Sequence, residues 1–253
     1  MKRMRTMGVC LGTALVICAV GAASASAAAP EIGRCLKVAA KTGKFSSAAC
    51  TTEKAGSSYE WTPGAVKNKF TTKGGLGILE TKSGNTVSCK TETSGGEFTS
   101  TKTVGGVVVK FNECESAGFK CSTVGSAEGE LVTKALEGKI GIQKKGAKAT
   151  SNKIAFDLFP LGKTGLFIEF SCGPLPLKVQ GSVLVPMTPT NKMTSALTLK
   201  FAASGGKQKP ENFEGEPKDV LESSLNGLPF EQSGQTITTV QTSEEPLELN
   251  TVV

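Results

Sequence analysis

Most of the chain consists of short segments rich in Val, Ile, Leu, Phe and Thr, separated by clusters of Gly, Asn, Pro and Ser. Residues 193–201 alternate, with Leu197, Leu199 and Phe201 on one face and polar side chains on the other; residues 178–185 alternate in the same way. Because successive side chains of a strand point to opposite faces, this pattern predicts antiparallel strands with one buried and one wet face.

No segment shows a long helical period, and 30 glycines fit the many turns that short strands require. We therefore expect an all-β fold, either an antiparallel β-sandwich or a barrel-like structure, with very little helix. The expected strands cover residues 69–73, 77–82, 86–92, 97–104, 106–113, 129–135, 138–143, 153–159, 166–172, 178–185, 193–201, 219–225, 235–242 and 247–252.

The first 27 residues have the three parts of a secretory signal peptide. A basic start precedes an apolar core at residues 7–20, and the small residues of 23–29 follow. We favour cleavage after Ala27, with cleavage after Ala25 as the near alternative. The core is shorter than the ~20 apolar residues of a spanning helix. We therefore expect a secreted or cell-surface protein that does not span the membrane after cleavage.

Six of the eight cysteines lie beyond the signal peptide. An even number of cysteines in an exported chain indicates disulfides, and six allow 15 connectivities. Short loops close at little entropic cost, so we expect cysteines on either side of a turn to pair, as at the turn centred on Gly43. The two remaining cysteines would then link distant strands. The expected pairs are Cys35–Cys50, Cys114–Cys121 and Cys89–Cys172.

Charge is distributed unevenly between the two parts of the mature chain. Residues 28–209 carry 25 basic and 13 acidic residues, whereas residues 210–253 carry Lys218 and nine acidic residues. We expect one β-rich domain over 28–253, in which 28–68 form a disulfide-tied hairpin region and the acidic C-terminal strands dock on the basic body. A lysine-rich surface favours anionic cell-wall polymers as a partner. Nucleic acid is not expected, because Arg34 is the only arginine left after cleavage.

The chain contains no histidine. This absence excludes Ser-His and Cys-His nucleophile pairs and histidine-bound zinc. The spacing of the cysteines, aspartates and glycines matches no metal or cofactor motif, so we expect neither. One catalytic arrangement stays open: Glu128 and Glu130 lie two apart on an expected strand, and two carboxyl groups on one face could divide acid and base roles as in glycosidases.

The mature chain contains the stretches Glu60-Trp-Thr-Pro-Gly64, Cys89-Lys-Thr-Glu-Thr-Ser-Gly-Gly96, Val104-Gly-Gly-Val-Val-Val-Lys-Phe111, Asp157-Leu-Phe-Pro160 and Glu214-Gly-Glu-Pro-Lys-Asp219. These stretches resemble uncharacterised secreted proteins of high-GC actinobacteria, and this resemblance implies export from a bacterium but no site. Together, the observations favour a secreted or cell-surface, non-enzymatic β-protein with a binding or structural role. The alternative is a carboxylate-based hydrolase that acts on an envelope polysaccharide.

Overall fold

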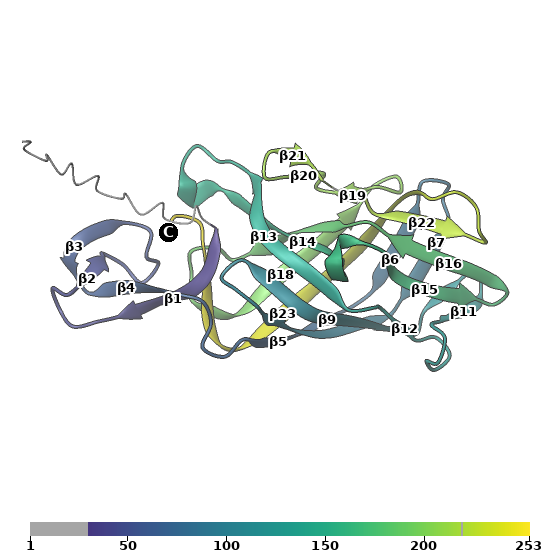
Figure 1. Ribbon diagram of the computed structural model, residues 1–253, viewed down its shortest axis with the longest axis horizontal. Helices are drawn as coiled ribbons and strands as arrows, with labels where there is room; N and C mark the ends of the chain where they lie inside the picture. The colour runs from purple at the N-terminus through teal and green to yellow at the C-terminus, as the bar shows by residue number, and fades with distance from the viewer. Residues whose placement is uncertain (1–29, 219) are drawn as a thin grey trace, which may run out of the picture.

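Eight antiparallel strands close into a barrel in the computed structural model, which describes residues 30–218 and 220–253 (Figure 1). Each strand pairs with the next, and the last pairs with the first. The expected all-β, barrel-like fold is therefore confirmed, whereas the expected signal peptide at 1–27 lies outside the described residues. In ring order the strands are β5 (Lys69–Gly74), β8 (Thr91–Phe98), β9 (Thr103–Asn112), β13 (Leu136–Lys144), β14 (Lys153–Pro160), β17 (Val183–Thr188), β18 (Thr194–Ala203) and β23 (Glu231–Asn250).

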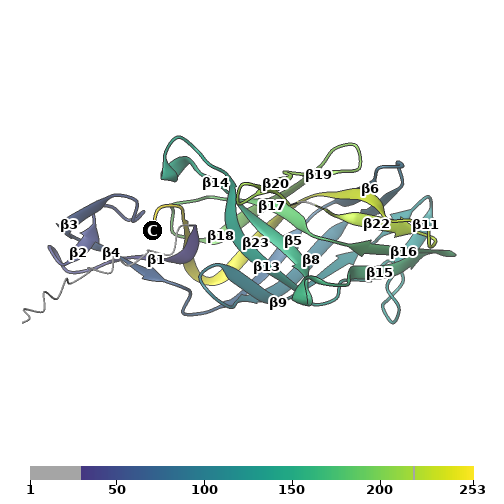
Figure 2. The same cartoon turned by 45° about the horizontal axis from the view of Figure 1, so that its top comes forward.

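A second closed ring of strand pairings extends the barrel at one end (Figures 1 and 2). It shares β23 with the first ring, so the two rings enclose one continuous core. In ring order its other strands are β6 (Gly77–Thr81), β7 (Thr86–Cys89), β10 (Glu115–Ser116), β11 (Phe119–Ser122), β15 (Leu166–Cys172), β16 (Leu175–Gln180) and β22 (Glu222–Leu225).

Strand β23 runs along both rings and joins them to the N-terminal part of the chain. Residues 233–236 pair with β6, residues 239–243 pair with β5, and residues 248–250 pair with β1 (Glu31–Lys37). The two strands expected at the C-terminus are thus parts of one 20-residue strand. The acidic C-terminal segment therefore supplies a structural strand to each ring.

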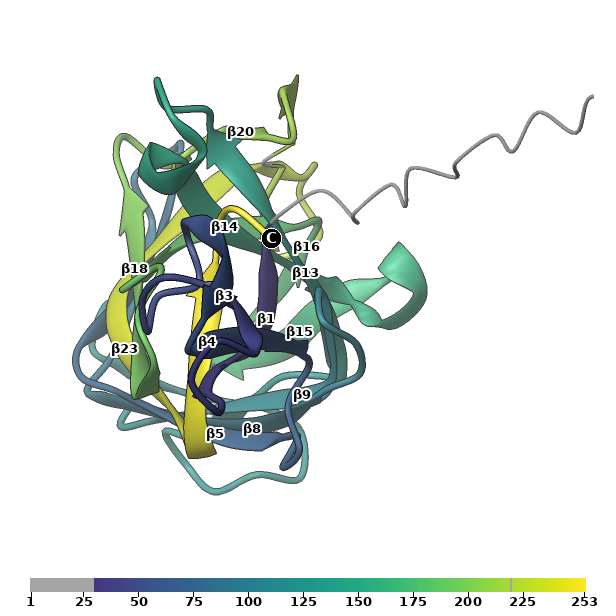
Figure 3. The same ribbon diagram turned by 90° about the vertical axis from the view of Figure 1, so that its left-hand side faces the viewer.

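The N-terminal unit, residues 30–64, packs at the other end of the barrel (Figure 3). Its remaining strands are β2 (Gly43–Phe45), β3 (Glu53–Ser57) and β4 (Tyr59–Pro63). The expected disulfide Cys35–Cys50 is present. The expected hairpin centred on Gly43 is not, because β1 pairs with β4 while β2 begins at Gly43 and pairs with β3.

The other two expected disulfides are wrong: the bonds are Cys89–Cys114 and Cys121–Cys172. The four cysteines form one row across the second ring, in the order 89, 114, 121, 172, with Cys114 directly before β10. Joining Cys114 to Cys121 would leave Cys89 and Cys172 three strand spacings apart. That is about 14 Å, twice the Cα separation that a disulfide spans. Bonds between Cys89 and Cys114 and between Cys121 and Cys172 each join direct neighbours and leave none of the four cysteines unpaired.

The expected inward face of Leu197, Leu199 and Phe201 is confirmed, since all three are buried in the core. The single strand expected over 178–185 is interrupted at Gly181. Its φ is +95°, and a Cβ there would lie 1.8 Å from the carbonyl oxygen of Val220, so the chain turns from β16 into β17 at this residue.

Short elements complete the described chain. A hairpin of β20 (Asn212–Phe213) and β21 (Glu216–Pro217) covers the outside of the barrel. The other short elements are β12 (Leu131–Val132), β19 (Gln208–Lys209) and the 3₁₀ turns Ala149–Ser151 and Leu161–Lys163. Over residues 30–218 and 220–253, no helix has the length and apolar character needed to cross a membrane.

Candidate ligand-binding site inside the barrel

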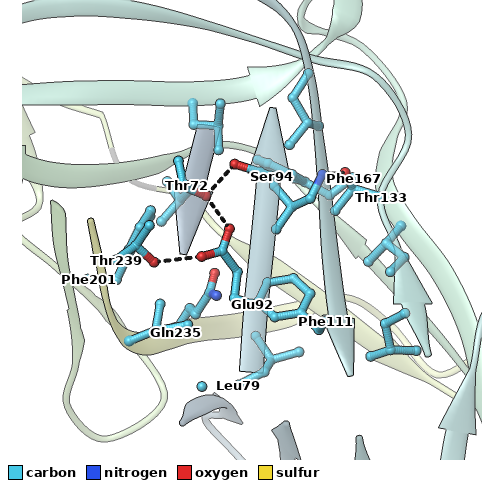
Figure 4. Close-up of a pocket in the computed structure, with 18 of the residues that line it drawn as sticks. Thr72, Leu79, Glu92, Ser94, Phe111, Thr133, Phe167, Phe201, Gln235 and Thr239 are labelled. Carbon is cyan, nitrogen blue, oxygen red and sulfur yellow. Dashed lines mark hydrogen bonds between the residues drawn. The ribbon is translucent and has the colours of Figure 1, made fainter. Parts of the chain in front are cut away.

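A cavity of about 140 Å³ lies inside the barrel and extends toward the second ring (Figure 4). Most of its wall is apolar, because the inward positions of the strands carry aliphatic and aromatic side chains. The wall on β9, β14 and β18, which we call the apolar wall, consists of Val107, Val109, Phe111, Phe156, Leu158, Leu199 and Phe201.

Polar side chains gather on one side of this cavity, on β5, β8 and β23. We call this group the polar patch. Thr72 donates its hydroxyl to Glu92, with Oγ1 2.6 Å from Oε1, and Thr239 donates to Oε2 at 3.0 Å (Figure 4). The hydroxyls of Thr72 and Ser94 are 2.6 Å apart. The patch consists of Thr72, Glu92, Ser94, Thr239 and Gln241.

Strand register brings the polar patch together. Thr72 lies between Ser94 and Gln241 in one cross-strand row. In the next row, Gly74 lies between Glu92 and Thr239. A Cβ on Gly74 would lie 2.8 Å from both Glu92 Oε2 and Thr239 Oγ1, so the missing side chain is what allows these two groups to meet.

Glu92 is the only residue with a free ionisable side chain among those that line the cavity. Its side chain is 4% exposed, and it takes part in none of the ion pairs found in the described part of the chain. Burial raises the pKa of Glu92 above its ordinary value, while the hydrogen bonds from Thr72 and Thr239 oppose this rise. Each oxygen of the carboxyl group accepts one of these hydrogen bonds and has capacity for a second.

Gln241 presents a buried hydrogen-bond donor to the same cavity. Its side chain is 4% exposed and lines the cavity, yet its Nε2 has no hydrogen-bond partner among the described residues. The amide of Gln235 also reaches the cavity, beside Glu92 (Figure 4). Buried amide donors are nearly always satisfied in folded proteins, so this donor is available to a molecule that enters the cavity.

The carboxyl pair predicted from sequence does not form a site. Residues 128 and 130 precede β12, so the expectation that both glutamates project from one strand face is wrong. Glu128 is exposed in a turn, and Glu130 forms an ion pair with Lys110. The described residues hold no group of three or more Asp, Glu, Cys or His side chains that could bind a metal.

Sequence reasoning missed the polar patch because Thr, Ser and Glu in a strand suggest a wet face. A signal was nevertheless present in the phase of the alternation. Phe70 is buried in β5, and Thr72 and Gly74 follow it at steps of two. Phe98 is buried in β8, and Ser94 and Glu92 precede it at even steps. Polar residues in phase with an inward phenylalanine point into the barrel.

No protein-family model, curated protein or solved structure matches this chain.

Proposed function

We propose that this is an exported, non-enzymatic binding protein that holds a small, largely apolar molecule inside its barrel. The observation that carries the proposal is the cavity of about 140 Å³, whose apolar wall faces a buried polar patch. The signal-peptide pattern at 1–27 and the three disulfides support export.

A cavity of this size lowers the stability of a purely structural protein. Unfilled volume in a core lowers stability because the lining side chains lose packing contacts. A cavity of roughly 150 Å³ lined by hydrocarbon is known to admit benzene, so the volume found here fits a ligand of about that size. A buried carboxyl group and an orphan amide in the same space would supply orientation and selectivity.

The composition of the cavity favours binding over hydrolysis. Glycoside hydrolysis in its usual form needs two carboxyl groups on either side of the scissile bond. The cavity holds Glu92 alone, and the lining residues include no histidine, lysine or free thiol that could share acid and base roles.

Titration of the mature protein with benzene tests the proposal, with binding read from calorimetry and from the rise in melting temperature. Leu79 lines the cavity, so Leu79→Phe should fill part of it and weaken binding. Leu76 is 61% exposed and does not line the cavity, which makes Leu76→Phe the matched control. Benzene binding to the native protein and to L76F, with loss in L79F, is the expected result. Failure of benzene to bind the native protein would refute the proposal.

A further inference from the structure

We infer that the ligand is a small alcohol or phenol, whose hydroxyl group bonds to the polar patch and whose hydrocarbon body fills the rest of the cavity. This inference rests on the proposed function. The chemical class of the ligand follows from the donors and acceptors that the patch leaves unused.

The direction of the hydrogen bonds determines what Glu92 still needs. Thr72 gives its only hydroxyl hydrogen to Glu92, so in the contact of 2.6 Å between Thr72 and Ser94 the donor is Ser94. Thr239 also donates to the carboxyl group. The three hydroxyl hydrogens are thus committed, whereas each carboxylate oxygen accepts one of these bonds and has capacity for a second. Glu92 can therefore accept a donor from a ligand.

Gln241 needs a hydrogen-bond acceptor. Its Nε2 group is a donor without a partner among the described residues. The other two side chains in its cross-strand row, Thr72 and Ser94, offer only hydroxyl oxygens as acceptors. Gln241 lies opposite Thr72, which bonds directly to Glu92. One small polar group placed between these side chains would meet both the acceptor and the donor.

A hydroxyl group supplies both functions from one atom. It has one donor hydrogen and two acceptor lone pairs. An ammonium group has donors only, so it would satisfy Glu92 and leave Gln241 without a partner. A carboxylate has acceptors only and would be repelled by Glu92. A hydrocarbon satisfies neither.

The volume and the apolar wall limit the rest of the ligand. The cavity of about 140 Å³ is near the roughly 150 Å³ that admits benzene, so the whole ligand has about six or seven heavy atoms. Phe111 and Leu199 lie on the strands that flank the polar patch, and Phe156 lies on β14 beyond them. A ring seated against these side chains would direct its hydroxyl group toward Glu92.

Phenol and toluene provide the test, because they have the same heavy-atom framework and differ in a hydroxyl or a methyl group. We expect phenol to bind the mature protein about tenfold more tightly than toluene, the effect of hydrogen bonds formed inside a dry site. Benzylamine serves as the cationic probe and is expected to bind more weakly than phenol. Calorimetry gives the three dissociation constants.

The Gln241→Leu variant shows whether the patch causes the preference. Leucine has nearly the volume of glutamine and removes a buried unsatisfied group, so the fold is retained, which circular dichroism would verify. In Q241L the preference for phenol over toluene should fall to about twofold or less, while toluene binding persists. Gln143, which lies on β13 and does not line the cavity, provides the control variant Gln143→Leu, which should keep the full preference.

The outcomes separate this inference from the proposed function. If toluene binds as tightly as phenol, or if benzylamine binds most tightly of the three, the barrel binds ligands but the hydroxyl assignment is wrong. A preference for phenol that survives in Q241L also overturns the assignment of the polar patch. If none of the three probes binds, the proposed function fails and this inference fails with it.

Discussion

Asn250 donates its side-chain amide to Glu248, with Nδ2 2.8 Å from Oε1, where the end of β23 meets the N-terminal unit. Both side chains are fully buried. The same amide also contacts the carbonyl oxygens of Ala49 and Cys50, and so ties the barrel to the disulfide-bonded loop. Glu248 Oε2 has no hydrogen-bond partner within the described chain, and burial raises the pKa of Glu248 to about 7.

The first prediction concerns the stability of this junction between pH 5 and pH 8. Folded Glu248 keeps its proton up to about pH 7, whereas the unfolded chain releases it near the ordinary value of 4.5. Between these two pKa values the unfolded state binds fewer protons than the folded state, so the free energy of unfolding falls as pH rises from about 5 to about 7 and levels off above that. The pKa difference corresponds to a loss of about 3 kcal/mol.

Urea unfolding of the native protein and of Glu248→Gln at the two pH values measures this loss. E248Q should lose less stability between pH 5 and pH 8 than the native protein and should be the more stable of the two at pH 8. Glu92 and Asp157 also have raised pKa values, but their contributions are the same in both proteins and cancel in the comparison. Glu244→Gln, at an exposed position of the same strand, should behave like the native protein. Equal pH dependence in E248Q and the native protein would contradict the prediction.

The second prediction concerns the row of cysteines in the second ring. Digestion of the unreduced protein, followed by mass spectrometry, should yield linked peptides for Cys89–Cys114 and Cys121–Cys172. Replacing Cys121 and Cys172 together by alanine opens a loop with a sequence separation of 51 residues. It should lower the free energy of unfolding by about 4 kcal/mol. A linked peptide that joins Cys114 to Cys121 would show that the row is paired otherwise.

The sequence predicted local features of the fold better than relations between strands. The alternation of Leu197, Leu199 and Phe201 indicates a strand and its buried face because that signal lies within a few residues. The error in the disulfides has a different origin: the partner of Cys121 depends on β11 lying beside β15, a result of ring closure that local sequence does not encode. The polar patch was missed for a related reason, since Glu92 is buried only because the barrel closes around it. Binding to anionic cell-wall polymers stays a prediction.

The third prediction concerns the hairpin that covers the outside of the barrel. Phe213 is 3% exposed and packs on Ala155 and Leu184, and its ring occupies the space where a side chain on Gly141 would lie. Phe213→Ala should lower the free energy of unfolding by about 3 kcal/mol, since it removes a buried ring and leaves a void. Leu228→Ala, at an exposed site, should change it by about 0.5 kcal/mol or less. A chemical denaturation curve for each variant gives both values, and similar losses in the two would show that the hairpin is not held by Phe213.

The last prediction concerns Gly74, which separates Glu92 from Thr239 in the cross-strand row. A methyl group at this position would lie 2.8 Å from Glu92 Oε2 and from Thr239 Oγ1, and 2.9 Å from Ile237 Cδ1. Carbon atoms of side chains do not approach neighbours this closely, so Gly74→Ala should force the two polar groups apart and break their hydrogen bond of 3.0 Å.

We expect G74A to lower the free energy of unfolding by about 1–3 kcal/mol, through overpacking and the loss of this bond. It should also weaken phenol binding more than toluene binding, because the displaced carboxyl group no longer faces the cavity in the same way. Gly95→Ala is the matched control on the adjacent strand β8, since a Cβ there would contact only the carbonyl oxygen of Phe70, at an ordinary 3.8 Å. Denaturation and calorimetry on both variants give the comparison. If G74A binds phenol like the native protein, the position of Glu92 does not depend on the space that Gly74 leaves.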